Sequence, residues 1–340
     1  MDHVRWGLLS TANINKKLIP AINESYRGSL AAVASRSKGL AVAYAAERRI
    51  PDSFGGYEEM LASDAIDAVY IGLPNHLHAP WTIKALEAGK HVLCEKPFAI
   101  TLEEVDQVIQ KSKETGLVVA EAFMYRHHPQ TKMVGEWVAS GRLGDITVVQ
   151  GTFNFKLDDP DNIRLVPEMG GGCLWDLGIY PVSYAQYLMG EAPEWVHGDQ
   201  CLGDTGVDMV FSGQMGYSSG KMALFSSSFR TPYHTFFEIM GTEGRLEIHQ
   251  PFVDMDTGQS LVYFPADGEP HYPTAIHKDH YLAEIKDMHS AILDGWMTYI
   301  SLEETRDHIQ TILALYESAR TGSTVYLAKD PKLVDPSSAF

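Results

Sequence analysis

Short apolar runs alternate with longer amphipathic stretches through the first third of the chain, and this alternation constrains the fold more than any other feature. Strand-like runs and the helix-like stretches between them lie at residues 4–9, 13–23, 30–34, 38–49, 68–71, 79–88, 91–94, 101–115 and 117–120. Strands that are joined through helices pair in parallel, with helices on both faces of the sheet. Residues 1–125 are therefore predicted to form an α/β domain. Thr101 followed by Glu104 predicts a capping box at the start of its last helix.

The pattern changes near residue 145. Residues 146–155 alternate between two sides of a strand, and the side with Val149, Phe153 and Phe155 is richer in large apolar groups. Further strand-like runs lie at 207–211, 221–228, 235–241, 245–249 and 260–264, with helix-like stretches at 176–189, 278–293 and 302–320. We expect a second, α+β domain over residues 126–340 with a large, open, mostly antiparallel sheet. The tail after residue 326 is expected to be irregular and free to pack against the first domain.

The chain is acidic, which restricts its partners. Among 340 residues, 27 Lys and Arg stand against 44 Asp and Glu, a formal net charge of −17. Such a surface disfavours non-specific binding to nucleic acid and to anionic membranes. The cysteines Cys94, Cys173 and Cys201 form no C-x-x-C pair, and no apolar segment is long enough for a signal peptide or a membrane span. We expect a cytoplasmic protein with reduced thiols.

A strand, a tight turn and a helix open the chain, and these are the parts of a dinucleotide-binding Rossmann unit. In the turn at residues 7–14, Ser10 and Ala12 occupy places that glycines hold in the G-x-G-x-x-G pattern. Taken alone, the turn is equally consistent with a strand that runs into a helix and binds nothing.

The end of the second strand indicates which nucleotide such a domain would bind. An acidic residue there holds the ribose 2′-hydroxyl of NAD, whereas an arginine accepts the 2′-phosphate of NADP. Residues 34–38 contain Ser35, Arg36 and Lys38 and no Asp or Glu. A hydroxyl beside a guanidinium suits a phosphate monoester, so we expect NADP, with NAD the less favoured cofactor. The alternative is that Arg36 is only a solvated loop residue.

Two polar loops follow the strands that are predicted at residues 68–71 and 91–94. The first spans residues 73–78, and the second contains Glu95, Lys96 and Pro97. Ligands bind at the carboxyl ends of strands in open parallel sheets, so both loops should face one crevice. Packing does not explain a Glu-Lys-Pro triplet at the end of an apolar strand, and Pro97 restricts Lys96 to an extended backbone. A partly desolvated lysine in this place is suited to proton transfer near neutral pH.

Together these segments resemble the glucose–fructose oxidoreductase/inositol dehydrogenase (Gfo/Idh/MocA) family of NAD(P)-dependent sugar oxidoreductases. The matching segments extend over nearly the whole chain and lie at residues 7–14, 34–36, 73–78, 95–97, 121–129 and 170–180. Residues 6–12 and 176–181 are most similar to the branch of NADP-linked D-xylose dehydrogenases and dimeric dihydrodiol dehydrogenases. The resemblance implies hydride transfer between NADP(H) and a hydroxyl or carbonyl carbon of a sugar or cyclic polyol.

The resemblance also implies roles for individual residues. Lys96 matches the catalytic lysine, Asp176 and Tyr180 complete the site, and Arg126 and Arg164 join them as expected substrate contacts. The implied cofactor-binding residues are Gly7, Ser10, Thr11, Ala12, Asn13, Ile14, Ser35, Arg36, Lys38, Leu73, Pro74, Asn75, His78, Glu95, Lys96 and Arg126. In a helix that begins near Asp176, Asp176 and Tyr180 would share one face. The charge of Lys96 would favour the phenolate of Tyr180, so that the two together take the hydroxyl proton.

Other functions fit the same residues. The enzyme could be a keto-sugar reductase or an inositol-type dehydrogenase, or the chain could be a sensor that binds NADP(H) without turnover. The presence of Lys96, Asp176 and Tyr180 disfavours a sensor. The histidine pairs at 76/78, 127/128 and 277/280 lack a zinc-ligand spacing, so we expect no metal. An apolar free face on the second sheet would favour a homodimer or homotetramer.

Overall fold

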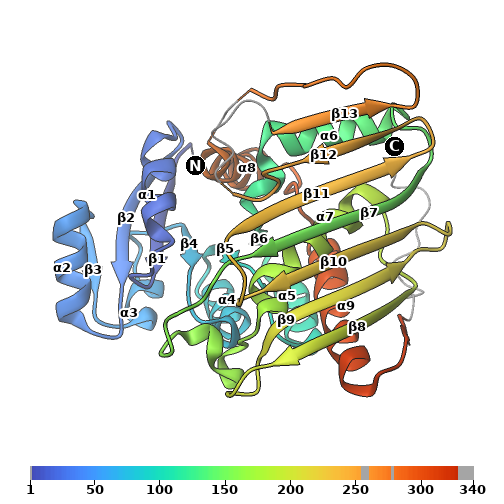
Figure 1. Ribbon diagram of the computed structural model, residues 1–340. Helices are drawn as coiled ribbons and strands as arrows, with labels where there is room; N and C mark the ends of the chain where they lie inside the picture. Colours follow the sequence, from blue (N-terminus) through green and yellow to red (C-terminus); the bar gives the residue numbers. More distant parts are fainter. Residues whose placement is uncertain (1, 254–259, 277–278, 328–340) are drawn as a thin grey trace.

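The computed structural model describes residues 2–253, 260–276 and 279–327, which form two sheets with helices packed on them (Figure 1). The first sheet has six strands and the second has eight. In Figure 1 the broad second sheet faces the viewer, with its helices behind it, and the first sheet lies to the left. The expected combination of a Rossmann-type parallel sheet and a second, mixed sheet is confirmed. A domain boundary after residue 125 stays a prediction.

All strands of the first sheet are parallel, in the order β3-β2-β1-β4-β5-β6. The strands are β1 (Val4–Leu9), β2 (Gly28–Ala34), β3 (Asp52–Phe54), β4 (Ala68–Ile71), β5 (His91–Glu95) and β6 (Val119–Ala122). The connecting helices are α1 (Asn15–Glu24), α2 (Lys38–Arg48), α3 (Tyr57–Leu61), α4 (His78–Glu87) and α5 (Leu102–Thr115). The sequence did not predict β3 and α3, because elements of three to five residues are too short to show a periodicity.

Helix α5 begins and ends at residues with capping geometry. Thr101 Oγ1 accepts the Glu104 N–H at 3.2 Å, and the Glu104 carboxylate accepts the Thr101 N–H at 3.2 Å, which confirms the predicted capping box. Gly116 ends the helix at a φ of 69°. The Val118 N–H then donates to the His91 ring at 3.0 Å, so that β6 begins two residues later than the predicted strand.

The second sheet has the order β13-β12-β11-β7-β10-β9-β8-β14, and every neighbouring pair except β7–β10 is antiparallel. Its strands are β7 (Ile146–Asn154), β8 (Trp195–Leu202), β9 (Asp208–Gly216), β10 (Met222–Ser228), β11 (His234–Gly241), β12 (Gly244–Ile248), β13 (Leu261–Pro265) and β14 (Val325–Tyr326). The helices are α6 (Pro129–Ala139), α7 (Ile179–Met189), α8 (His280–Asp294) and α9 (Leu302–Thr321). Strand β8 was not predicted because its buried positions are Val196 and Gly198, which give little hydrophobic contrast.

One face of the second sheet packs on helices, as the alternation in β7 predicted. Val149, Gly151 and Phe153 are buried on this face. Helix α7 lies so close that a Cβ atom at Gly151 would be 2.9 Å from Pro181 Cβ. Gly151 therefore permits the approach of this helix, which carries part of the site described below.

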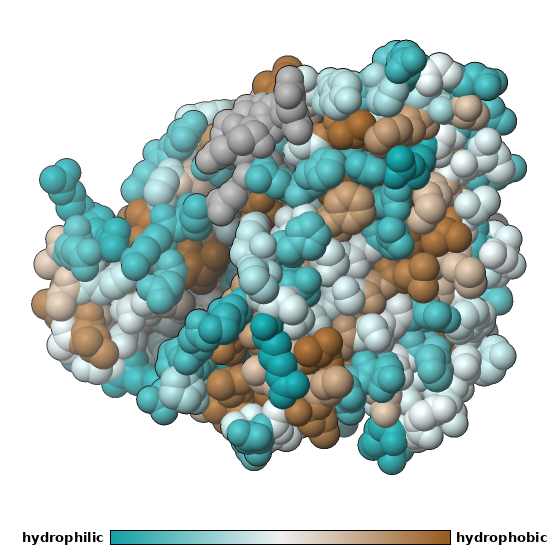
Figure 2. All heavy atoms as spheres, viewed as in Figure 1, coloured by the Kyte–Doolittle hydropathy of each residue, from teal (hydrophilic) through white to brown (hydrophobic). Residues whose placement is uncertain are grey.

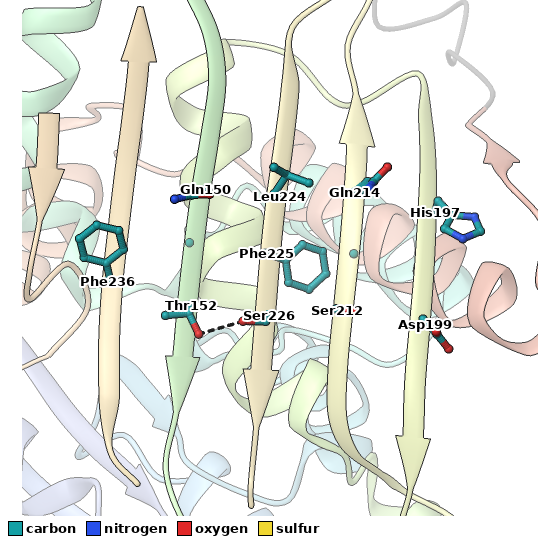
Figure 3. A pocket seen from close by; sticks show the side chains of 12 residues that line it. Gln150, Thr152, His197, Asp199, Ser212, Gln214, Leu224, Phe225, Ser226 and Phe236 are labelled. Atoms are coloured by element: carbon teal, nitrogen blue, oxygen red, sulfur yellow. Dashed lines mark hydrogen bonds between the residues drawn. The ribbon is translucent and has the colours of Figure 1, made fainter. Parts of the chain in front are cut away.

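The opposite face of the second sheet is uncovered in the single chain. Hydrophilic and hydrophobic side chains are interspersed over it (Figure 2). Close to the sheet centre, Gln150, Thr152 and Ser226 stand beside Phe236, and the Thr152 and Ser226 hydroxyls are 3.0 Å apart (Figure 3). The free face is thus only partly apolar. In the described part of the chain, no helix combines the length and the hydropathy that crossing a bilayer requires.

Helix α8 belongs to the second half of the sequence but packs on the first sheet. Leu282, Ile285 and Met288 join the apolar cluster that β1 and α1 form. The Trp6 indole N–H donates to His289 Nε2 at 2.9 Å, so the remaining ring proton lies on Nδ1, 2.9 Å from the Ser25 hydroxyl. The two lobes therefore share a core. Of the predicted tail after residue 326, Leu327 donates its backbone N–H to the Glu194 carbonyl at 2.8 Å, and residues 328–340 lie outside the described residues.

Candidate active site

A cavity of about 640 Å³ lies between the two lobes, at the carboxyl ends of β1, β4 and β5. Many residues that the sequence singled out line it: Ala12, Asn13, Ile14, Leu73, Asn75, His78, Glu95, Lys96, Arg164, Asp176 and Tyr180. Others from the expected set do not: Gly7, Ser10, Thr11, Ser35, Arg36, Lys38, Pro74 and Arg126. The structure thus brings together the proposed catalytic residues and the start of α1.

Lys96 and Asp176 form the polar centre of the cavity. Lys96 Nζ donates to the Asp176 backbone carbonyl at 2.7 Å and to Asp176 Oδ1 at 3.0 Å. Arg164 Nε donates to the other carboxylate oxygen, Oδ2, at 2.6 Å. Burial by itself raises the pKa of Asp176, but Lys96 and Arg164 outweigh it and lower the pKa to about 2. Asp176 is therefore an anion that holds two cations in the wall of the cavity.

Tyr180 lines the cavity, but the helix around it and the orientation of its hydroxyl differ from the prediction. Asp176 lies in a π-helical turn, Leu174–Gly178, and Tyr180 is the second residue of α7, so the regular helix starts later than predicted. Lys96 Nζ lies 4.9 Å from the centre of the Tyr180 ring, and the hydroxyl points to Met124 Sδ at 3.8 Å. Burial raises the pKa of Tyr180 well above its ordinary value. The expectation of a phenolate stabilised by Lys96 is wrong, because the ring faces the ammonium and the hydroxyl does not.

Glu95 is held by a partner, Tyr70, that the sequence did not indicate. The Tyr70 hydroxyl, in the middle of buried strand β4, donates to Glu95 Oε1. Burial raises the pKa of Glu95, although Lys96 and the Tyr70 hydrogen bond act against this rise. A single tyrosine in an apolar strand carries no sequence signal that distinguishes it from a core residue.

The turn before α1 is held to the end of β4 by hydrogen bonds of Ser10. Ser10 has a φ of 118°, in the region that favours glycine, and its hydroxyl donates to the Gly72 carbonyl at 2.8 Å. The Ala12 N–H donates to the same hydroxyl at 3.2 Å, which ties the turn to the end of β4. Ile14 at the N-cap of α1 provides no side-chain cap, and the first turn of α1 contains no acidic residue. A helix N-terminus of this kind, open to a cavity, suits a phosphate group.

The remaining residues of the expected cofactor set lie outside the cavity or are engaged elsewhere. Gly7 packs in the core, where an added Cβ would lie 3.0 Å from Ile66. Ser35 and Arg36 follow β2 on the same sheet edge as the cavity, with Ser35 buried and Arg36 exposed. Lys38 Nζ donates to the Ser53 carbonyl.

Two polar residues of the expected set are committed to protein contacts. His78 is buried, with Nδ1 2.7 Å from the Pro97 carbonyl and Nε2 2.7 Å from the Leu73 carbonyl, so neither nitrogen faces a ligand. Burial lowers the pKa of His78 to about 4, so near neutral pH the ring donates to one of these carbonyls. Arg126 is buried as well. Its Nη1 pairs with Glu304, and its guanidinium lies 3.8 Å from the Tyr187 ring centre, away from the cavity.

The histidine pairs are spread through the structure. His76 lies in the short helical turn after β4, and His128 caps α6 by accepting the Gln130 N–H at 3.1 Å. Of the 277/280 pair, the first residue lies outside the described residues. Where the structure describes the chain, no three His, Cys, Asp or Glu side chains lie together as metal ligands would.

Two family models match the chain. Residues 4–123 match the family's NAD-binding Rossmann fold, and residues 131–247 match the GFO/IDH/MocA C-terminal domain. The chain belongs to the GFO/IDH/MocA oxidoreductase family. The predicted family and the prediction of an oxidoreductase are therefore confirmed.

Individual relatives cover the chain almost from end to end. D-xylose 1-dehydrogenase (NADP(+)) 2 of Haloferax volcanii is 40% identical over 325 residues, which are 95% of this chain and 99% of that enzyme. The crystal structure of an aldose–aldose oxidoreductase from Caulobacter crescentus, complexed with glycerol, has a TM-score of 0.87 at 26% identity and covers 96% of this chain and 100% of that one. A 3-ketoreductase from Actinomadura kijaniata, in complex with NADP and TDP-benzene, has a TM-score of 0.86 at 28% identity, with 93% and 98% covered.

Proposed function

We propose that this protein transfers a hydride between NADP(H) and a hydroxyl or carbonyl carbon of a sugar or cyclic polyol. One observation carries the proposal: the Lys96–Asp176 pair lies in the same cavity as the uncapped N-terminus of α1. The first can move a proton, and the second can hold a nucleotide phosphate. The similarity to an NADP-dependent D-xylose dehydrogenase supports an aldopyranose as the substrate.

In the proposed reaction a carbinol loses the hydrogen on its carbon as a hydride and the hydrogen on its oxygen as a proton, and a C=O bond forms. A bound nicotinamide supplies the hydride acceptor in this direction and the donor in the other. In the oxidation the neutral amine of Lys96 takes the hydroxyl proton at Nζ and becomes the ammonium that pairs with Asp176, and in the reduction the ammonium returns that proton. Asp176 holds Lys96 and Arg164 at fixed positions, and the Tyr180 ring covers the Lys96 ammonium.

The choice of NADP over NAD is attributed to Arg36. Arg36 is exposed at the end of β2, where a ribose 2′-phosphate lies in dinucleotide folds, with the Ser35 hydroxyl next to it in the chain. Removal of a charged partner from a phosphate costs about 1.5–3 kcal/mol. In Arg36→Ala, the ratio of kcat/KM for NADP+ to that for NAD+ should therefore fall about tenfold or more. Arg320→Ala, on the remote helix α9, should leave the ratio unchanged.

The proposed function is tested by a panel of substrates. Purified protein is mixed with NADP+ or NAD+ and with D-xylose, D-glucose, other aldopyranoses, inositol or a cyclic trans-diol, and reduced nicotinamide is followed by its absorbance. Turnover of an aldopyranose with NADP+ is the expected result. Reduction of a keto sugar by NADPH, without oxidation of any alcohol in the panel, would favour the keto-sugar reductase instead. Tight NADP+ binding with no turnover in either direction would favour the sensor.

We also propose that the open face of the second sheet joins two copies of the chain as a homodimer. This face lies opposite the helices and carries Phe236 and Leu224 among polar side chains (Figure 3). Light scattering after size exclusion should give about twice the chain mass of 37.7 kDa. Phe236→Asp should give the monomer, whereas Tyr26→Asp, which changes an exposed aromatic residue after α1, should not. A wild-type monomer would contradict the proposal.

A further inference from the structure

The peptide bond that follows Lys96 and Pro97 is held on both sides by buried side chains. The Phe98 N–H donates to Glu121 Oε1 at 3.0 Å, and the Pro97 carbonyl lies 2.7 Å from His78 Nδ1. Because Pro97 has no N–H, the Phe98 N–H is the first backbone hydrogen-bond donor after Lys96. A hydrogen bond to this N–H can therefore hold the loop in place. Glu121 and His78 therefore determine where the loop that carries Lys96 lies.

Glu121 is an unusual residue for its place in the fold. It lies on β6, in register with Cys94 on β5, and the residue is 1% exposed. A carboxyl group buried at this depth needs hydrogen-bond partners for its oxygens. Oε1 has the Phe98 N–H, whereas Oε2 makes no hydrogen bond with any group that the structure describes.

The second oxygen of Glu121 faces the other lobe. Glu121 Oε2 lies 3.6 Å from Nδ1 of His308, which is fully buried on α9. His308 Nε2 lies 3.8 Å from Glu304 Oε1, and that carboxylate is the one that pairs with Arg126. The Phe123 ring meets the His308 ring edge to face at a centroid distance of 5.5 Å and fixes its plane. A series of contacts between polar side chains thus runs from the Lys96 loop through Glu121 and His308 to Glu304, near the start of α9.

We propose that Glu121 is a positioning residue for Lys96, and that His308 supports it from the second lobe. Glu121 touches neither the cavity nor Lys96 itself, so it acts through the Phe98 backbone. Lys96 Nζ must meet Asp176, which belongs to the second lobe, at 3.0 Å. The Glu121–His308 contact ties the same two lobes together behind the lysine, and thereby fixes the distance that this ion pair requires. The proposal rests on the function proposed above for Lys96.

The test compares three substitutions at Glu121. Glu121→Leu removes the acceptor for Phe98, and a misplacement of about 1 Å can cost on the order of 10²-fold in turnover. We expect kcat to fall by about that factor, while the Kd for NADP+ stays within about threefold. Glu121→Gln keeps an acceptor at the same reach and should retain kcat within about fivefold. Glu121→Asp keeps the charge but is one methylene shorter, and it should lose kcat as Glu121→Leu does. His308→Leu should give a smaller loss, of about three- to tenfold.

The matched control is Glu104→Leu. Glu104 also accepts backbone N–H groups in this loop, from Ile100 at 3.1 Å and Thr101 at 3.2 Å, but it lies on the outside of the molecule. This variant should lower the melting temperature and leave kcat unchanged. Full activity of folded Glu121→Leu would overturn the proposal. If Glu121→Leu does not fold, an active Glu121→Asp together with an inactive Glu121→Gln would overturn it, because charge and not placement would then matter.

An NMR measurement that needs no turnover tests the positioning role of Glu121 independently of the proposed reaction. Lysines are labelled by reductive ¹³C-methylation, and the Lys96 signal is identified by its loss in Lys96→Arg. The signal should move in Glu121→Leu and stay in place in Glu104→Leu. If the wild-type enzyme turns over nothing in the panel and the signal still moves, the positioning role stands and the proposed reaction fails. An unmoved signal in folded Glu121→Leu overturns the positioning role, whatever the enzyme turns over.

Discussion

At the scale of single residues, the contacts of Lys96 predict that its substitution lowers turnover but leaves cofactor binding nearly unchanged. Lys96→Met keeps the length of the side chain and removes the group that donates to Asp176. We expect kcat to fall by about 10²–10⁴-fold, the range for loss of a general acid–base group. The Kd for NADP+, measured by fluorescence titration, should change less than about threefold, because the lysine does not form the turn before α1. Lys84→Met removes a surface ion pair with Glu58 and should change neither value. Parallel losses of binding and turnover would contradict the assignment.

Asp176 gives a prediction about pH. Burial acts to raise its pKa, but Lys96 and Arg164 lower it to about 2, from 3.8 in an unperturbed aspartate. Because the folded-state pKa is depressed, the stabilisation is complete well above pH 4 and is lost as the pH falls toward 2. Urea unfolding should show that wild type exceeds Asp176→Asn in stability by a margin that is constant from pH 7 to 5. This margin should narrow by about 1 kcal/mol between pH 5 and pH 3. A margin that does not change over this range would contradict the proposed ion pairs.

The sequence predicted correctly which side chains line the cavity where neighbouring residues in the chain determine the orientation of the side chain. Lys96 follows a buried strand and precedes a proline, so its place at the sheet edge could be predicted, and the structure lines the cavity with it. Arg126 lies in a short turn between the lobes, and its direction depends on Tyr187 and Glu304, which are distant in sequence. Glu121 could not be ranked above other buried polar residues, because its role comes from a hydrogen bond to the loop after β5.

At the scale of elements, the π-helical turn before α7 is held at its start by Asp208 of β9. Asp208 Oδ2 accepts the Leu174 N–H at 2.7 Å, and Oδ1 accepts from the Tyr316 hydroxyl at 2.8 Å. A Cβ atom on Gly172, whose φ is 122°, would lie 2.0 Å from Asp208 Oδ1. The turn that places Asp176 in the cavity therefore depends on glycine at position 172.

Two glycine substitutions at opposite ends of this segment test that dependence. Gly190, at the end of α7, has a φ of 71° and open space around the position of a Cβ. Gly190→Ala should cost about 1–2 kcal/mol of stability and keep kcat, since only the backbone is strained. Gly172→Ala adds a collision, which should raise the cost to about 3 kcal/mol or more and lower kcat. Equal costs in urea unfolding would show that the Asp208 contact does not constrain the turn.

Long periodic elements could be predicted from the sequence, and short or strongly coupled ones could not. Helices α5 and α9 have caps and a repeated apolar face, and their predicted limits agree with the structure within one residue. The π-helical turn at Leu174–Gly178 has no such pattern, because the contacts that widen it come from β9 and α9.

At the scale of the whole molecule, α8 makes the first lobe dependent on the second. Leu282, Ile285 and Met288 bury part of the β1–α1 surface, and His289 bonds Trp6. A fragment of residues 1–125 should therefore expose apolar surface, bind the dye ANS and unfold without a cooperative transition, whereas the full chain should unfold in one transition. Circular dichroism and ANS fluorescence during a urea titration measure both. Cooperative unfolding of the isolated fragment would contradict the prediction.

Because α8 packs on the first sheet, the N-terminal lobe cannot complete its core until α8 has been synthesised. During synthesis β1 and α1 are made first and α8 is made near the end. The hydrogen bond between Trp6 and His289 therefore cannot form until most of the chain has been made. Throughout that interval the nascent N-terminal lobe displays the patch that α8 later covers. Chaperones that recognise apolar surface should bind chains truncated before residue 280 and released from the ribosome, and should bind the full chain, which includes α8, much less. Release of the N-terminal lobe by chaperones should therefore depend on translation of the last fifth of the chain.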